Sequence, residues 1–223
     1  MDVLNTIQQL AVMALPLVFA ITVHEAAHGW MAKQLGDRTA EMLGRVSLNP
    51  IKHIDPLGTI LIPVGMFLLT GFLFGWAKPV PIGWRNLKRP RRDMALVALA
   101  GPGANLLMGA IWGLLIHLGL MFRHSFEWVA TPLIFMGAFG VLINVFLMVL
   151  NLMPILPLDG GRVLNSLLPP RLSVGYSRLE PYGLFIIVGL LVAGLLGKII
   201  LPMVLFAVEM LPASGVVKEL FLV

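Results

Sequence analysis

The chain has 223 residues, of which 58% are hydrophobic and 12% charged, and its mean hydropathy is +0.92. This composition leaves too little polar surface for a water-soluble globule, so it excludes a soluble domain and indicates a protein of the lipid bilayer. The formal charge of +5 is carried in short stretches between apolar segments. That pattern is typical of membrane topology and does not require nucleic acid as a partner. The absence of cysteine excludes disulfides, thiolate metal ligands and a cysteine nucleophile.

The apolar segments predict one integral-membrane domain, 1–223, built as an all-α bundle of about four to six transmembrane helices. Each segment is close to the roughly 20 residues that a spanning helix requires. The segments are 10–32, 57–76, 94–121, 131–152 and 182–201. Because the N-terminus lacks the basic region and cleavage site of a signal peptide, we expect segment 10–32 to be retained. The apolar tail 202–223 contains prolines and charged residues, and it fits either an interfacial helix or a sixth span.

Two short segments between the apolar ones have a different character. Gly44–Leu48 and Val80–Trp84 contain β-branched residues and lie among Pro and Gly. They predict small strands or hairpins at the membrane surface.

The sequence His24-Glu25-Ala26-Ala27-His28 lies inside the first apolar segment. Two histidines four residues apart project from one face of a helix and can bind one metal ion, and the intervening glutamate can reach a metal-bound water. Ionisable groups inside a membrane segment are costly and usually mark a functional site. The alternative interpretation is a polar cluster that only joins neighbouring helices.

A catalytic zinc site needs a third protein ligand and an open position for water. Most other acidic residues lie in loops, at segment ends or in the tail, whereas Asp159 follows a stretch broken by Pro154 and Pro157 and precedes two glycines. Irregular backbone beside a membrane segment is tolerated where it lines a cavity, so this stretch suits the presentation of a carboxylate. On spacing alone, an aspartate in an ordinary interfacial turn explains Asp159 equally well.

These motifs together resemble the site-2 protease family of intramembrane metalloproteases, in particular its short bacterial and archaeal members without PDZ or CBS domains. The resemblance is carried by HEAAH and by the pattern N-x-x-P-x-x-x-L-D-G over Asn151–Gly160. It extends to Leu48–Gly58, Phe74–Pro79 and Ala100–Asn105.

The resemblance implies a role for several residues of this chain. His24, His28 and Asp159 correspond to the family's zinc ligands, and Glu25 to its catalytic base. Asn151 corresponds to an asparagine that binds the substrate backbone or the oxyanion, and an interhelical hydrogen bond is its alternative explanation. Asn105 corresponds to a polar position on a core helix, where a substrate or oxyanion contact and an interhelical hydrogen bond are equally good explanations. His53, in the loop after the motif helix, fits a supporting or surface histidine better than a fourth ligand.

The implied reaction is hydrolysis of a peptide bond within the membrane. One Zn²⁺ per chain would activate a water, and Glu25 would take its proton and deliver it to the leaving amine. The expected partners are the bilayer and a transmembrane segment of a substrate protein, which must unwind locally before cleavage. Two other classes remain open: a transporter that uses these groups as an ion pathway, and an inactive membrane scaffold.

The HEAAH motif and Asp159 have to lie on the same side of the membrane to form one site, and this requirement predicts the topology. If every segment up to 131–152 crossed the membrane once, HEAAH and Asp159 would face opposite sides. Segment 57–76, which is interrupted by Pro and Gly and flanked by basic loops, is therefore expected to be re-entrant or to lie at the surface. This arrangement places 13 of the 16 basic residues on one side, which predicts a multi-pass protein of the cell membrane with its active site toward the cytoplasm. The alternative is that 57–76 spans and 94–121 does not.

Overall fold

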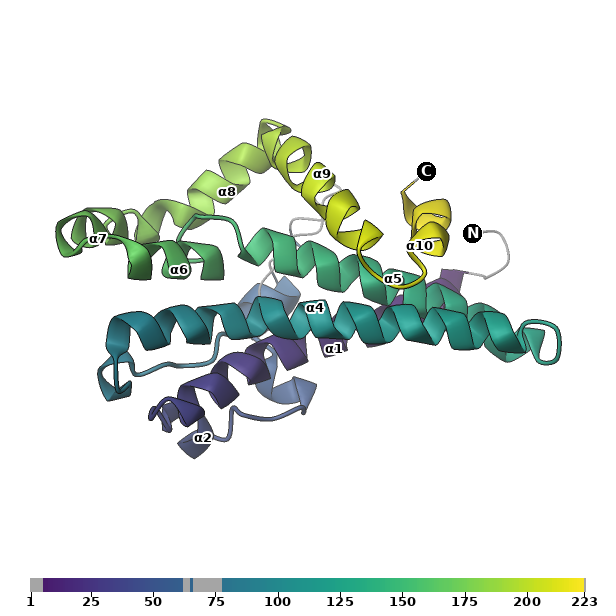
Figure 1. The fold of residues 1–223 in the computed structure, drawn as a ribbon, viewed down its shortest axis with the longest axis horizontal. Helices are drawn as coiled ribbons and strands as arrows, with labels where there is room; N and C mark the ends of the chain where they lie inside the picture. The colour runs from purple at the N-terminus through teal and green to yellow at the C-terminus, as the bar shows by residue number, and fades with distance from the viewer. Residues whose placement is uncertain (1–5, 62–64, 66–77, 223) are drawn as a thin grey trace.

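The computed structural model describes residues 6–61, 65 and 78–222, and it is built from helices (Figure 1). The three long helices are α1 (Thr6–Gln34), α4 (Pro90–Phe122) and α5 (Glu127–Asn151). Within the described residues these three are long and apolar enough to cross a membrane, and a bent pair, 170–192 with 195–209, would make a fourth span. The predicted all-α membrane architecture is confirmed, while the predicted count of four to six spanning helices stays a prediction.

Helices α4 and α5 pack closely along their length because glycines lie at the interface. A Cβ added to Gly140 would lie 2.4 Å from the Trp112 ring, and one added to Gly137 would lie 2.7 Å from Ile116. Small residues of this kind let membrane helices approach each other where no hydrophobic effect drives them together. The main apolar core extends from this contact to α9.

The C-terminal end of α1 lies beside the N-terminal end of α4. The backbone N–H of Lys88 donates to the carbonyl of Leu35 at 3.2 Å, and the two helices run in opposite directions (Figure 1). The connection between them therefore starts and finishes at the same end of the bundle, as the parity argument requires. Its described elements are α2 (Thr39–Met42), η1 (Pro50–His53), η2 (Pro56–Leu61) and η3 (Trp84–Asn86). Most of segment 57–76 lies outside the described residues, so its re-entrant path stays a prediction.

The prediction of short strands at 44–48 and 80–84 is wrong, since no described residue forms a strand. Residues 44–48 and 80–83 are turns, bends or irregular backbone, and Trp84 begins η3. Gly44 adopts a left-handed conformation (φ +63°) that closes the turn after α2. At the second segment, Pro79 and Pro81 have no N–H to donate to a ladder. Proline therefore outweighs the β-branched residues on which the prediction rested.

The C-terminal third forms short helices. These are α6 (Asp159–Leu167), α7 (Pro170–Ser177), η4 (Glu180–Tyr182), α8 (Gly183–Val192), α9 (Leu195–Glu209) and α10 (Ser214–Phe221). Segment 182–201 was expected to be one helix, but it is divided at Gly194, which is left-handed (φ +66°) and ends α8. The bend of 86° leaves α8 and α9 as the two arms of a chevron (Figure 1). A break at glycine is the physical reason for this correction.

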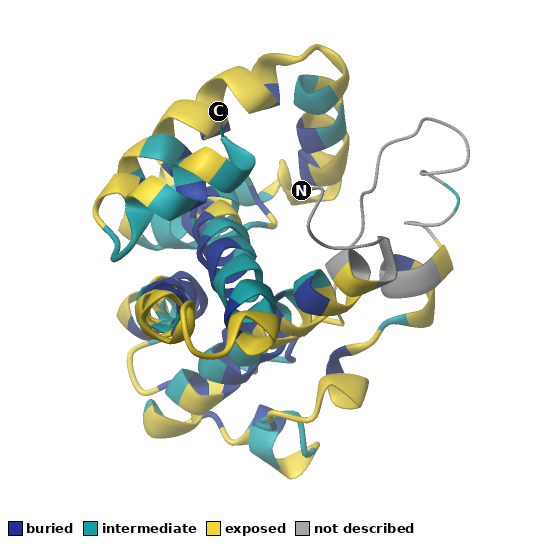
Figure 2. Cartoon of the chain, turned by 90° about the vertical axis from the view of Figure 1, so that its right-hand side faces the viewer, coloured by how far each residue is buried: buried dark blue, intermediate teal, exposed yellow. Residues whose placement is uncertain are grey.

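Large apolar side chains are exposed on the outer faces of the bundle. Figure 2 shows exposed residues along the outside of the helices and buried ones facing inward. On α4, Leu107 is 63% exposed and Leu114 57%. Such a surface would be a liability in water but matches the acyl chains of a bilayer.

Candidate metal centre

Helix α1 presents His24 and His28 on the face that packs into the bundle. The buried residues of α1 recur every fourth position, at Val12, Pro16 and Ala20, and the histidines continue this stripe. Both imidazoles are buried, and their Nε2 atoms are 3.0 Å apart. The i, i+4 spacing thus produces the pair of convergent nitrogens that the sequence predicts.

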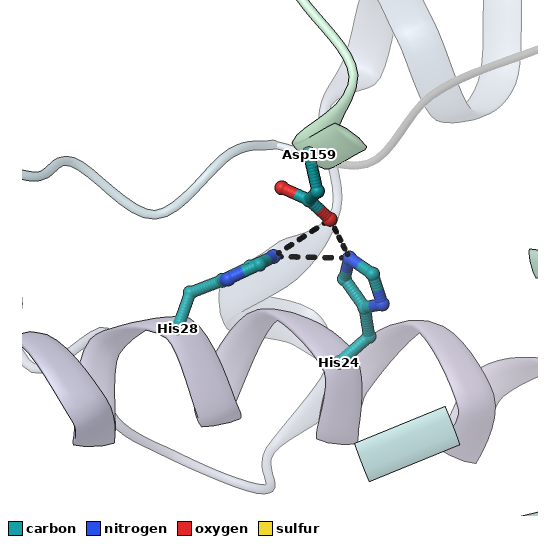
Figure 3. A group of neighbouring side chains, drawn as sticks. All are labelled: His24, His28 and Asp159. Carbon is teal, nitrogen blue, oxygen red and sulfur yellow. Dashed lines mark hydrogen bonds and ion pairs between the residues drawn. The ribbon is translucent and has the colours of Figure 1, made fainter. Parts of the chain in front are cut away.

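Asp159, the first residue of α6, completes the group. Its Oδ2 atom lies 3.2 Å from Nε2 of His24 and 3.3 Å from Nε2 of His28 (Figure 3). The following glycine holds this end of α6 against the turn after α5, because a Cβ on Gly160 would lie 2.1 Å from the carbonyl oxygen of Leu152. Three groups from two distant parts of the chain therefore meet at one buried point.

The donor atoms have the spacing of metal ligands. Three ligands about 2.0–2.1 Å from one tetrahedral ion lie roughly 3.3–3.4 Å from one another, close to the distances found here. Oδ2 of Asp159 is also buried without a hydrogen-bond partner among the described residues. A buried, unpaired carboxylate oxygen is costly unless a cation satisfies it. The three side chains could therefore hold one metal ion and leave a fourth position for water or substrate.

The three groups have to be in their metal-binding protonation states to act together. A divalent metal requires Asp159 as the ionised carboxylate and each imidazole as a neutral donor.

The outer nitrogen of each imidazole has its own partner on α4. Nδ1 of His28 donates to the carbonyl oxygen of Val97 at 2.7 Å. Nδ1 of His24 lies 2.5 Å from Oδ1 of Asn105. Since both oxygens only accept, both Nδ1 atoms carry the proton and both Nε2 lone pairs face Asp159. Helix α4 thereby selects the tautomer that can bind metal.

The orientation of the Asn105 amide is fixed by further bonds. Its Nδ2 donates to the Ala20 carbonyl at 3.2 Å and to Oδ1 of Asn144 at 2.9 Å. Asn144 in turn donates to the carbonyl of Gly140 at 2.8 Å. Both asparagines are fully buried. This chain of bonds joins α1, α4 and α5 and leaves Oδ1 of Asn105 facing His24.

A glycine of α4 provides the space for the two imidazoles. A Cβ added to Gly101 would lie 2.5 Å from Nε2 of His28 and 2.6 Å from Cε1 of His24. Any larger residue at this position would displace the rings. The contact of Gly101 with the imidazoles is not visible in the sequence.

Glu25 lies beside the metal group without being part of it. Its side chain is half-buried, and Oε2 accepts a hydrogen bond from the backbone N–H of Val80 at 2.9 Å. The position next to His24 on the same helix suits a group that acts on a bound water. The partner, Val80, was not anticipated, because a backbone N–H has no sequence signature.

The remaining candidates have other hydrogen-bond partners. Asn151, the last residue of α5, donates to the carbonyl of Leu147. His53 is buried, and its Nε2 lies 2.8 Å from the carbonyl oxygen of Ser47. Asn144 was missed, although an amide within the apolar segment 131–152 is itself a signal for a site or an interhelical bond.

Comparisons with known proteins fit this chemistry. The sequence model of peptidase family M50 matches residues 118–194, which include Asp159. The chain is 39% identical over 194 residues to "Putative zinc metalloprotease YwhC" of Bacillus subtilis (strain 168), over 86% of this chain and 84% of that protein. It is 31% identical over 185 residues to "Putative zinc metalloprotease Rip2" of Mycolicibacterium smegmatis, over 81% of this chain and 66% of that protein. No solved structure matches.

Proposed function

Because this chain belongs to peptidase family M50, the site-2 proteases, and is a metalloprotease, we propose that it hydrolyses peptide bonds within or near transmembrane segments of other membrane proteins. One zinc ion held by His24, His28 and Asp159 would serve the reaction. The proposal rests above all on the convergence of the two Nε2 atoms and Oδ2, 3.0–3.3 Å apart, inside an apolar bundle.

The chemistry follows from the donor set. Zinc in such a site supplies a water of lowered pKa and polarises the scissile carbonyl. Val97 and Asn105 keep the Nδ1 protons in place, so the imidazoles stay neutral donors through Nε2. Gly101 leaves room for both rings. These residues hold the ligands in position before substrate arrives.

Glu25 is the general base in this proposal. Its carboxylate takes the proton of the attacking water and later delivers it to the amine of the leaving peptide. The bond from Val80 engages Oε2 and leaves Oε1 to act on the water. Asn151 is proposed to bind the substrate backbone or the oxyanion. Its half-buried amide at the end of α5 donates one N–H to the Leu147 carbonyl, and the amide has a second N–H that can bind substrate.

His24, Glu25 and His28 lie within the candidate span 11–34, so the substrate has to reach them inside the membrane boundary. A peptide bond in an intact helix is shielded and hydrogen-bonded, and a substrate segment must therefore unwind locally. Transmembrane segments with helix-weakening residues are the proposed substrates. We further propose that the chain resides in the cytoplasmic membrane with the site toward the cytoplasm. Most of the basic residues lie at the C-terminal end of α1, at the N-terminal end of α4 and in the connection between them, and such residues favour the cytoplasmic side.

The experiment is a combined metal and cleavage measurement on the purified chain in detergent or liposomes. We expect about one zinc per chain, cleavage of a membrane-embedded model substrate containing Gly and Pro, loss of cleavage on prolonged chelation, and recovery on adding zinc. A chain that binds zinc but cleaves no such substrate would contradict the proposed function. Metal-independent ion transport by the same sample would favour the transporter interpretation.

A further inference from the structure

The backbone segment 78–83 crosses α1 beside Glu25, and it has an unusual distribution of donors. Within Pro79-Val80-Pro81 only Val80 has a backbone N–H, because proline has none. That single N–H donates to Oε2 of Glu25 at 2.9 Å. The prolines also restrict the backbone to extended conformations, so the donor is held on a stiff segment.

The segment lies directly against α1 because a glycine faces it. A Cβ added to Gly29, one residue after His28, would lie 3.2 Å from the Val80 side chain. Val80 itself is buried. Close contact with α1 is thus built into both partners.

One end of segment 78–83 is fixed by Arg45 and by the backbone near His53. The guanidinium of Arg45 donates to the carbonyl oxygens of Lys78 at 3.0 Å and Pro79 at 3.3 Å, and also to that of Lys52. The N–H of Lys78 donates to the His53 carbonyl at 2.9 Å. These bonds set the direction in which the segment approaches Glu25.

The other end is fixed by Asp37, a fully buried carboxylate that the proposed reaction does not use. Its Oδ2 accepts from the N–H of Gly83 at 2.6 Å. Its Oδ1 accepts from the backbone and hydroxyl of Thr39 and from Nδ2 of Asn86. Burial would raise the pKa of Asp37, but the bonds from Thr39, Asn86 and Gly83 hold that pKa below its usual value. Asp37 thus ties segment 78–83 to the end of α1 with charge-assisted bonds.

We propose that segment 78–83 is a positioning arm for Glu25, and that Asp37 and Arg45 are positioning residues that act through it. Asp37 and Arg45 fix the two ends of the arm, and the Val80 N–H in its middle orients one oxygen of the Glu25 carboxylate. The other oxygen stays directed at the reacting water. This inference rests on the proposed role of Glu25 as general base.

Hydrogen exchange at Val80 tests the contact independently of catalysis. Because Pro79 and Pro81 have no amide hydrogen, Val80 is the only exchanging backbone site in residues 79–81, and mass spectrometry of overlapping peptides can isolate it. We expect Glu25→Ala to speed exchange at Val80 about tenfold, as loss of one hydrogen bond predicts. Unchanged exchange in that variant would overturn the contact.

The same measurement tests the two positioning residues. Asp37→Asn and Arg45→Gln should each speed hydrogen exchange at Val80. If Asp37→Asn, a change at a buried residue, does not fold, Arg45→Gln still tests the proposal. Arg85→Gln is the matched control, because Arg85 is an exposed neighbouring cation with no hydrogen bond or ion pair to any described residue. If the Val80 amide exchanges at the same rate in Arg45→Gln and Arg85→Gln, Arg45 does not position the arm. An unchanged Val80 exchange rate in folded Asp37→Asn would likewise exclude Asp37 as a positioning residue.

A pair of substitutions at Val80 links the arm to turnover. Val80→Pro removes the N–H, whereas Val80→Ala keeps it and removes only side-chain packing. We expect Val80→Pro to lower kcat about 10- to 100-fold relative to Val80→Ala, the cost of a misplaced catalytic group, with KM and zinc content equal in the two. Equal kcat in the pair would overturn the proposal. If the wild type has no protease activity, the proposed function fails, and the exchange measurement still decides whether the arm holds Glu25.

Discussion

Oδ1 of Asn105 accepts the Nδ1 proton of His24 across 2.5 Å, so an amide in the middle of α4 determines which nitrogen of a histidine on α1 can bind metal. The amide has no freedom to turn over, because its Nδ2 is engaged by Ala20 and Asn144. Three long helices therefore contribute to the state of one proposed ligand.

We predict that Asn105→Ala weakens zinc binding about 10- to 100-fold, the usual cost of losing a partner behind a metal-bound histidine. Competition with a chromogenic chelator measures the affinity. Asn151→Ala is the control, since Asn151 bonds to Leu147 and not to a ligand. It should keep zinc affinity, and equal affinity in both variants would contradict the role of Asn105.

Gly101→Ala should impair the site by steric overlap. The new methyl group would lie 2.5 Å from Nε2 of His28, and relief of such a clash costs about 1–3 kcal/mol of stability or of zinc-binding free energy. Gly103→Ala, two residues along the same helix, is the matched control because its added Cβ meets nothing within 4 Å. The check is zinc affinity together with the thermal unfolding temperature. Equal values for the two variants would show that Gly101 does not limit the space around the imidazoles.

How far the sequence predicts this site depends on how local each contact is. His24, Glu25 and His28 form a pattern within one helical turn, and periodicity alone places them together. Asp159 joins them only through the packing of α6 on α4, which is why spacing left it open and the family resemblance was needed to select it. Val97 contributes a backbone carbonyl, which any residue type could supply at that position. Val80 contributes a backbone N–H, which any residue type except proline could supply. Neither contact could therefore be predicted from the sequence. The break at Gly194 was missed because hydropathy does not detect a left-handed residue.

Glu25→Gln should abolish most cleavage while zinc content stays unchanged. The glutamine keeps the shape of the side chain and an oxygen for the Val80 N–H, but it cannot accept the proton of the water. General-base catalysis contributes about 10²- to 10⁴-fold, so kcat should fall by that order. Glu127→Gln, a glutamate at the exposed start of α5, is the control. Substantial activity in Glu25→Gln would exclude Glu25 as the base.

Asp159→Ala should lower zinc occupancy as well as activity, because it removes one of three proposed ligands and leaves the two histidines. The contrast with Glu25→Gln is the informative result, since only the variant of a ligand should lose metal. Metal analysis after dialysis against a weak chelator measures occupancy. Full occupancy in Asp159→Ala would mean that the carboxylate does not bind the ion.

The last prediction concerns the sides of the membrane. Since Lys88 bonds to Leu35, the turn after α1 and the start of α4 share one end of the bundle, and the connection between α4 and α5 lies at the other. The chain has no cysteine, so single cysteines can be placed without background. Met42→Cys and Arg92→Cys, both at exposed positions near the first end, should react with a membrane-impermeant maleimide from the same side. Ser125→Cys, exposed between α4 and α5, should react from the opposite side.

The distribution of charge predicts which side is which. The end shared by Met42 and Arg92 carries 13 of the 16 basic residues if segment 57–76 makes no net crossing. By the bias of Lys and Arg toward the cytoplasm, that end should be labelled only when the cytoplasmic face is accessible, as in inverted vesicles. Labelling of Met42→Cys and Arg92→Cys from opposite sides would mean that the connection crosses the membrane, and the proposed zinc ligands could then not share one site. Labelling of both from the outside would keep the site intact but reverse its orientation in the membrane.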